Sequence, residues 1–208
     1  RCAVRMPAKL EGRTWRDRVE VLAADVTVRA DMDRACDGVD AVVYLLRAVD
    51  GRPDLVDRER DGAAVVRDAA AAAGVDRIVY LGALGDAATS TRAAERQAIG
   101  RLLADGPVDV TELRAGVIIG SGSAWFEMIR HTTELLPLMV IPSWIATRTQ
   151  PIAIRDVLRA LVDVLAIDAT RGEVLELGGP EVLTFREMML RYAAAAGLRR
   201  RTILAVPV

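Results

Sequence analysis

Two cationic residues near the start of the sequence, Arg5 and Lys9, are suited to holding a phosphate group. Arg5 ends the short apolar run Cys2–Arg5, and Lys9 follows about one turn later. A guanidinium offers its donors in a rigid fork that matches phosphate oxygens, and a nearby ammonium adds a second positive charge. The other interpretation, that Arg5 is solvated at a strand end with Lys9 on the surface, stays open.

Other kinds of chemistry lack the residues they need. Cys2 and Cys36 are far apart in the sequence and His131 is the only histidine, so a Cys/His zinc site of usual spacing cannot form. The sequence contains no Gly-x-Ser-x-Gly segment that would place a serine nucleophile for a triad with His131. Residues 120–123 read Gly-Ser-Gly-Ser but lack a third glycine, and we interpret them as a turn. No metal site is expected.

The composition is typical of a globular protein. Hydrophobic residues make up 52% of the chain and charged residues 27%, and the formal net charge is −1. This charge offers no attraction to a phosphate backbone, and nucleic acid is not an expected partner. The apolar stretch Leu135–Thr147 is too short to span a bilayer and contains two prolines. No signal peptide is visible, and we expect a cytoplasmic location.

Short β-branched runs alternate with amphipathic helical stretches. The expected strands are Cys2–Arg5, Val19–Leu22, Ala41–Leu46, Arg77–Leu81, Val110–Leu113, Val117–Ile119, Pro151–Ile154 and Val174–Leu177. Helices are expected at Arg60–Ala73, which Gly74 ends, at Arg92–Ala104, at Trp125–Leu136, after Ile154, and after the capping pattern Thr184–Glu187. Ala41–Leu46 and Ile78–Leu81 are apolar on both faces, which is typical of strands covered by helices on both sides. The sequence predicts an α/β fold with a doubly wound parallel sheet.

In such sheets, ligands bind at the carboxyl ends of the strands. The residues expected there are Arg5, Asp25, Val26, Leu45, Leu46, Arg47 and Gly82.

Several segments, taken in order, resemble the atypical short-chain dehydrogenase/reductases. Residues 2–10 (CAVRMPAKL) resemble the second strand and turn of that family, "VR-x-P-x-K-L", and Ala24-Asp25-Val26 resembles its "G-D-V". Residues 73–81 (AGVDRIVYL) resemble the approach to its fifth strand, and residues 149–157 and 177–180 match its carboxyl-terminal landmarks. The chain is most similar to bacterial NAD(P)H-binding proteins. These are similar in turn to NmrA-like redox regulators and to the Rossmann-type accessory subunit of respiratory complex I.

The resemblance implies one Rossmann NAD(P)-binding domain over residues 1–208. Residues 1–120 would form its nucleotide-binding part and residues 121–208 a small, interleaved substrate lobe. NADP is the implied cofactor, with NAD as the alternative, because Arg5 stands where an acidic residue would bind the ribose of NAD and instead suits a 2′-phosphate. Lys9 would add to that charge, and Asp25 and Val26 would flank the adenine. Asp25 as a cap of the next helix is a compatible alternative.

The resemblance implies that the family's first strand and its glycine-rich loop are missing from this sequence. By the family's strand order, Cys2–Arg5 matches the second strand and Ala41–Leu46 the fourth. Neighbouring strands lie roughly 4.8 Å apart, so these two are expected at about twice that distance, with no ladder between them.

The catalytic signature of the family does not match. Its enzymes carry a serine at the end of the fifth strand and a Tyr-x-x-x-Lys on the next helix. Here the strand end reads Leu81-Gly82-Ala83, and Arg92 and Arg96 stand at the tyrosine and lysine positions. Arginine hardly releases its proton at neutral pH and is a very poor general acid. No catalytic residue is therefore assigned, and Arg96 is expected either to hold the ribose or pyrophosphate or to face solvent.

Two functions remain open on this basis. The first is an NADP(H)-dependent oxidoreductase of unknown substrate, for which a flavin-like or quinone acceptor would not need a tyrosine proton. The second is a non-catalytic NADP(H)-binding sensor, or an accessory module of a larger redox complex. The absence of the serine, tyrosine and lysine from their usual positions favours the second.

Overall fold

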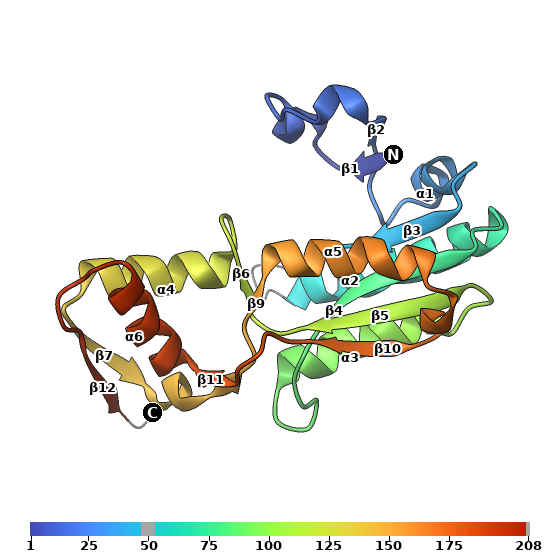
Figure 1. The fold of residues 1–208 in the computed structure, drawn as a ribbon. Coiled ribbons are helices and arrows are strands. Elements are labelled where there is room, and N and C mark those ends of the chain that lie inside the picture. The colour runs from blue at the N-terminus through green and yellow to red at the C-terminus, as the bar shows by residue number, and fades with distance from the viewer. Residues whose placement is uncertain (47–52, 207–208) are drawn as a thin grey trace. The chain divides into compact units, whose positions relative to one another are not determined.

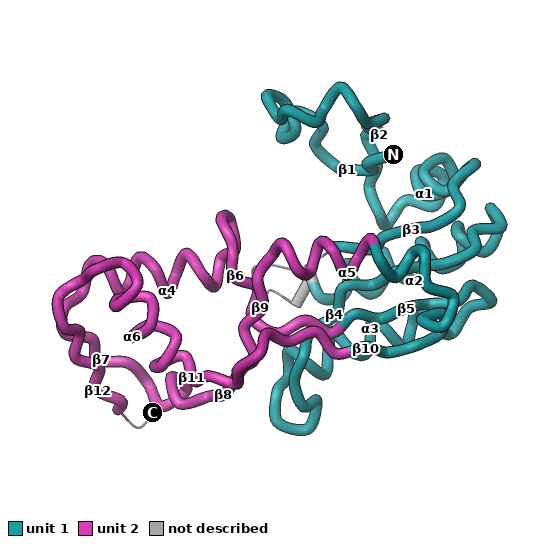
Figure 2. Tube along the Cα trace, in the orientation of Figure 1, with its two compact units in different colours: residues 1–113, 163–175 teal, residues 114–162, 176–208 magenta. Residues whose placement is uncertain are grey.

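The computed structural model describes residues 1–46 and 53–206, with side chains described from residue 56 onward in the second range. Figure 1 traces the order of the elements along the chain. The chain divides into two compact units, which Figure 2 colours separately. Unit 1 comprises residues 1–113 and 163–175, and unit 2 comprises residues 114–162 and 176–208. The functional division expected at residue 120 stays a prediction.

The described strands of unit 1 form two sheets. In the first, β1 (Cys2–Val4) pairs in parallel with β2 (Val21–Ala23). The second has the order β10-β5-β4-β3, formed by β10 (Val174–Leu177), β5 (Asp109–Ala115), β4 (Arg77–Ala83) and β3 (Ala41–Tyr44). β3 and β4 run parallel, and the hydrogen bonds from β5 to β10 advance in the same direction along both strands. The predicted α/β fold with a parallel sheet is confirmed.

β1 and β3 are the two strands that the sequence predicted not to pair. Among the described residues these two strands are not paired, as predicted, and belong to different sheets. A cavity of about 1430 Å³ is lined from both sides, by Val4 on β1 and by Val43 on β3 among others. Val43 is 40% exposed, although its apolar run predicted cover on both faces. β3 therefore differs from β4, whose residues 77–80 are all buried.

Three helices of unit 1 pack in sequence order. They are α1 (Arg29–Cys36), α2 (Pro53–Ala72) and α3 (Thr91–Ala104), with α1 against α2 and α2 against α3. α2 begins seven residues before the predicted Arg60, at a proline, which is well tolerated in the first turn of a helix. Ala63, Ala69 and Ala70 on its inner face are fully buried, because a methyl side chain lets neighbouring elements approach closely.

The end of α2 follows the sequence pattern. Gly74 has a φ of 70°, the left-handed conformation that a glycine adopts without strain. Its amide donates to the carbonyl of Ala71, and the amide of Val75 donates to that of Ala70. This is the Schellman arrangement, which satisfies the last carbonyls of the helix.

Unit 2 is built from short strand pairs and two helices. β6 (Ile118–Ile119) pairs with β9 (Ile152–Ala153), β7 (Leu138–Pro142) with β12 (Thr202–Val206), and β8 (Arg148–Thr149) with β11 (Leu183–Thr184). The helices are α4 (Ala124–Leu135) and α6 (Phe185–Ala195), and α5 (Ile154–Ala166) spans the boundary between the units. Short 3₁₀ helices occupy Pro7–Leu10, Arg16–Arg18, Ser143–Ala146 and Asp168–Thr170.

The core of unit 2 lies where α4 and α6 pack on one face of the β7–β12 pair. Met139, Ile141 and Ile203 point into it, and Phe185 stacks against Trp125 with ring centroids 5.6 Å apart. The sequence did not predict β7 or β12. Among the described residues, no helix combines the length and the apolarity that crossing a bilayer requires.

Candidate functional site

The carboxyl ends of β1, β2 and β3 border the same cavity. Six of the nine predicted binding residues line it, namely Arg5, Lys9, Asp25, Val26, Leu45 and Leu46. Of the other three, Arg47 lies outside the described residues, and Gly82 and Arg96 are not among the lining residues. Leu45 is 55% exposed and Leu46 38% exposed, so the cavity has an apolar wall at the end of β3.

The β1–β2 register places Arg5 and Asp25 at the same edge of the strand pair. Val4 pairs with Ala23, and the amide of Ala24 donates to the carbonyl of Val4 at 3.0 Å. Arg5 directly follows Val4, and Asp25 is the second residue after Ala23, so both follow the carboxyl ends of their strands. Arg5 is exposed, and within residues 1–46 and 53–206 its side chain has no hydrogen bond or ion pair. The same holds for the side chain of Lys9 in the following 3₁₀ turn.

Both carboxylate oxygens of Asp25 have protein donors. Oδ1 accepts from the amide of Thr27 at 3.0 Å and from its hydroxyl at 2.8 Å, and Oδ2 accepts from Arg58 Nη2 at 2.9 Å. The hydrogen bonds from Thr27, with a smaller contribution from Arg58, lower the pKa of Asp25. α1 begins after Val28 without a side-chain cap, so Asp25 stabilises the turn before the helix and does not cap it.

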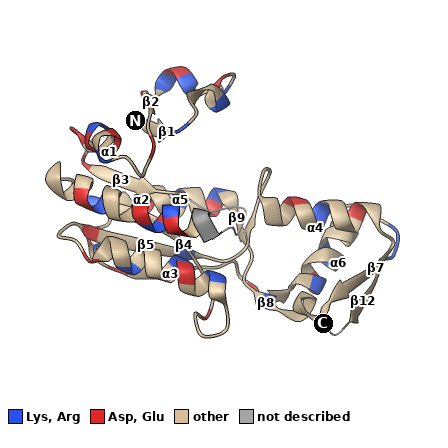
Figure 3. Ribbon diagram, turned by 180° about the vertical axis from the view of Figure 1, so that it is seen from behind, with Lys and Arg blue, Asp and Glu red and all other residues tan. Residues whose placement is uncertain are grey.

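The side chain of Val26 packs against α2 at Gly62. A Cβ atom placed on Gly62 would lie 2.7 Å from Val26 Cγ1, so only a glycine lets the helix approach this closely. Figure 3 shows acidic and basic residues interspersed along α2. Arg58, a basic residue of this helix, forms an ion pair with Asp25, which follows β2.

Arg96, on α3, is buried close to Leu46, which follows β3, and to Leu81 of β4. It is 7% exposed, so the alternative that it faces solvent is wrong. Its Nη1 donates to the carbonyl of Leu46 at 3.0 Å and to the carboxylate of Glu59, which is also 7% exposed, and its Nη2 donates to the carbonyl of Leu81. One guanidinium thus ties two strand ends to α2. Whether it also contacts a dinucleotide stays a prediction.

Two buried tyrosines complete the surroundings of Arg96. The guanidinium lies 5.0 Å from the ring centroid of Tyr80, and the rings of Tyr44 and Tyr80 are 6.0 Å apart. The Tyr44 hydroxyl donates to the carbonyl of Glu59, and that of Tyr80 to the carbonyl of Arg96. Burial raises the pKa of both hydroxyls. They are donors within the core and are poorly suited to acid–base chemistry near neutral pH.

Gly82, on β4, is packed against a buried carboxylate. A Cβ atom there would lie 2.7 Å from Oε1 of Glu112, which is 3% exposed, and one on Gly100 of α3 would also meet that side chain. Packing against Glu112 therefore explains why position 82 requires a glycine. A cofactor contact at Gly82 stays a prediction. Arg92, at the position of the family's tyrosine, is exposed.

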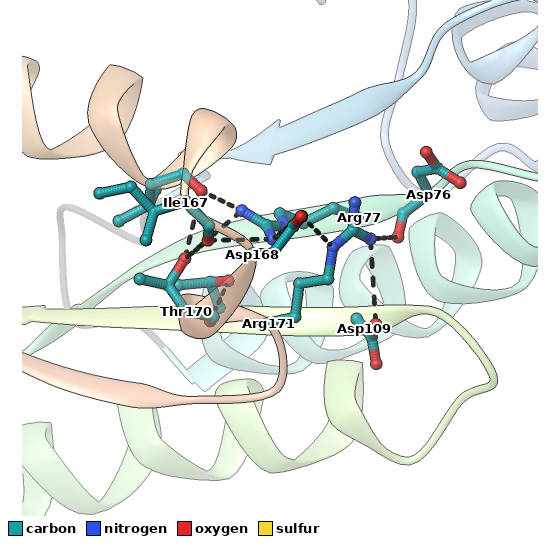
Figure 4. A network of polar contacts seen from close by, with 9 residues as sticks. Asp76, Arg77, Asp109, Ile167, Asp168, Thr170 and Arg171 are labelled. Atoms are coloured by element: carbon teal, nitrogen blue, oxygen red, sulfur yellow. Dashed lines mark hydrogen bonds and ion pairs between the residues drawn. The ribbon is translucent and has the colours of Figure 1, made fainter.

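A polar network that the sequence analysis missed lies at the opposite end of β4. Arg77 is 2% exposed and donates to the carbonyls of Val164 and Ile167, as Figure 4 shows. Arg171 donates to the carbonyl of Asp76 at 3.1 Å and forms an ion pair with Asp168 at 3.2 Å. The network joins residues 163–175 to the sheet of unit 1. Asp76, Arg77 and Arg171 also line the cavity, at the amino-terminal end of β4.

The chain is similar to known proteins in sequence and in fold. A family model described as NAD(P)H-binding matches residues 1–122. A comparison with curated protein sequences gave no match.

Solved structures share the fold at low sequence identity. A nucleoside-diphosphate-sugar epimerase from Staphylococcus aureus is 20% identical, with a TM-score of 0.76 over 99% of this chain and 70% of its own. Triphenylmethane reductase from Citrobacter sp., complexed with NADP(H), is 20% identical, with a TM-score of 0.75 over 99% and 68%. Pen from Bacillus thuringiensis is 16% identical, with a TM-score of 0.78 over 97% and 66%. The chain spans about two thirds of the length of these structures.

Proposed function

The chain belongs to the NAD(P)H-binding family, and we propose that it serves as an oxidoreductase of the short-chain dehydrogenase/reductase superfamily that uses NADP(H). The observation that carries this proposal is Arg5. It is a cation without a protein partner among the described residues, it borders a cavity of about 1430 Å³, and it lies at the strand edge where such sheets bind ligands. The Citrobacter structure of the same fold is a reductase complexed with NADP(H), which supports the proposed class.

The residues present fit the adenosine end of such a cofactor. Arg5 and Lys9 would hold the 2′-phosphate, because both are cations without a described partner at the cavity wall. Asp25 and Val26 would flank the adenine, the carboxylate as an acceptor and the valine as an apolar contact. Leu45 and Leu46 would exclude water beside it, and Arg47, Gly82 and Arg96 complete the proposed set. When bound, NADPH would supply a hydride. We also propose a cytoplasmic location, in keeping with two free cysteines.

The burial of Arg96 and its ion pair with Glu59 favour a second function. The two positions from which the family's tyrosine and lysine would act hold an exposed arginine and a buried, ion-paired one. Neither releases a proton near neutral pH. A binding module that holds NADP(H) as a sensor, or as part of a larger redox complex, needs no proton donor and fits this arrangement.

The two functions are distinguished by turnover. The full-length protein is incubated with NADPH and a panel of quinones and aldehydes, and oxidation of NADPH is followed by its absorbance. Oxidation that depends on both the protein and one acceptor supports the oxidoreductase. Saturable NADPH binding without oxidation by any acceptor of the panel supports the module. The absence of saturable binding of either dinucleotide contradicts both.

A further inference from the structure

Arg58 and Asp25 form an ion pair at the cavity that Arg5 also lines. Arg5 is the first residue after β1 and Asp25 the second residue after β2, so both lie at the carboxyl edge of this strand pair, and both line the cavity. A carboxylate at this edge can pair with a guanidinium that lines the same cavity. Arg5 nevertheless has no ion pair among the described residues, whereas Oδ2 of Asp25 accepts from Nη2 of Arg58 at 2.9 Å.

We propose that Arg58 is a positioning residue that sets the preference for NADP(H) over NAD(H) by occupying Asp25 and leaving Arg5 available to the 2′-phosphate. The inference rests on the proposed function and adds a residue to it. Thr27 already satisfies Oδ1 of Asp25 with two hydrogen bonds, so Arg58 provides the remaining donor and balances the negative charge.

Arg58 would affect the cofactor preference only through its ion pair with Asp25. Arg58 lies on α2, one residue before Glu59, which is the buried partner of Arg96. The Arg58 side chain is 45% exposed and that of Asp25 is 27% exposed, so the pair borders solvent and is not part of the core. Without Arg58, Asp25 would attract Arg5 and would also repel a phosphate that carries about two negative charges. Both effects would weaken the binding of a 2′-phosphorylated cofactor and leave the binding of NAD(H) nearly unchanged.

The ratio of the dissociation constants for NADPH and NADH isolates this effect. Adenine is common to both cofactors, so any change in its contact with Asp25 cancels in the ratio. At low ionic strength, where screening is weak, Arg58→Met is expected to raise the ratio about tenfold, the scale of one charge-assisted hydrogen bond. Arg58→Lys keeps the charge and is expected to keep most of the preference. Arg60→Met removes an exposed cation from the same helix, away from this cavity, and is the matched control with an unchanged ratio.

The double variant Arg58→Met with Asp25→Asn tests the mechanism. A neutral amide does not draw Arg5 away, so the ratio is expected to return toward that of the wild type. If the ratio stays raised in the double variant, or if Arg58→Met and Arg60→Met change it equally, the inference is wrong while the proposed function stands. If the unaltered protein binds neither dinucleotide, the proposed function fails and this inference fails with it. Circular dichroism of each variant confirms that it is folded.

Discussion

Replacing Arg96 with methionine is expected to destabilise unit 1 strongly. The side chains of Arg96 and Glu59 are each 8% exposed, and the guanidinium is also a donor to the carbonyls of Leu46 and Leu81. Removing the cation leaves a buried carboxylate and the carbonyls of Leu46 and Leu81 without that donor. Breaking a buried ion pair from one side costs about 3–5 kcal/mol of unfolding free energy. At about 2–4 °C per kcal/mol for a chain of this size, the midpoint of thermal unfolding should fall by roughly 10 °C.

Thermal unfolding followed by circular dichroism measures the shift, and hydrogen exchange of the β4 amides assigns it to unit 1. Glu59→Gln added to Arg96→Met removes the buried charge and is expected to restore about 1–3 kcal/mol. Arg92→Met, an exposed change on the same helix, should stay within about 0.5 kcal/mol of the wild type. Wild-type stability of Arg96→Met, or a double variant no more stable than the single one, would refute the reasoning.

Three smaller changes test local parts of the structure. Thr184→Ala removes the hydroxyl that caps α6 and should cost about 1 kcal/mol in urea unfolding, whereas Thr184→Ser should cost little. Gly62→Ala places a methyl group 2.7 Å from Val26 and should cost about 1–3 kcal/mol, with a loss of affinity for both dinucleotides. The hydrogen bonds from Thr27 lower the pKa of Asp25 in the folded protein. The stability advantage of the wild type over Asp25→Asn should therefore be constant above about pH 5 and disappear as the pH falls through the folded pKa. An advantage that grows in acid would contradict the assignment.

Features set by neighbouring residues could be predicted from the sequence. The Schellman end of α2 at Gly74 and the capping box of Thr184 and Glu187 are local patterns, and both are present. The apolar run of β4 predicted a central strand, and residues 77–80 are buried. The lack of pairing between β1 and β3 followed from strand order alone.

Features set by distant partners could not be predicted. β12 is recognisable only beside β7, which lies some 60 residues earlier in the chain. Arg96 is buried because Glu59, 37 residues away, neutralises it, and an arginine on a helix otherwise indicates a solvated position. Arg77 is likewise buried by carbonyls 87 and 90 residues away. Val43 is exposed because no described strand pairs with β3 on its cavity side, which an apolar run by itself does not indicate.

The most direct test of the proposed function is the affinity of the full-length protein for NADPH and NADH, measured by calorimetry with the wild type and Arg5→Ala. If Arg5 holds the 2′-phosphate, the substitution should weaken NADPH binding by about 1.5–3 kcal/mol, which is roughly 10- to 150-fold. NADH binding should change by no more than about twofold, since NADH lacks that phosphate. Equal losses for both cofactors would contradict the assignment of Arg5 and, with it, the proposed preference for NADP(H).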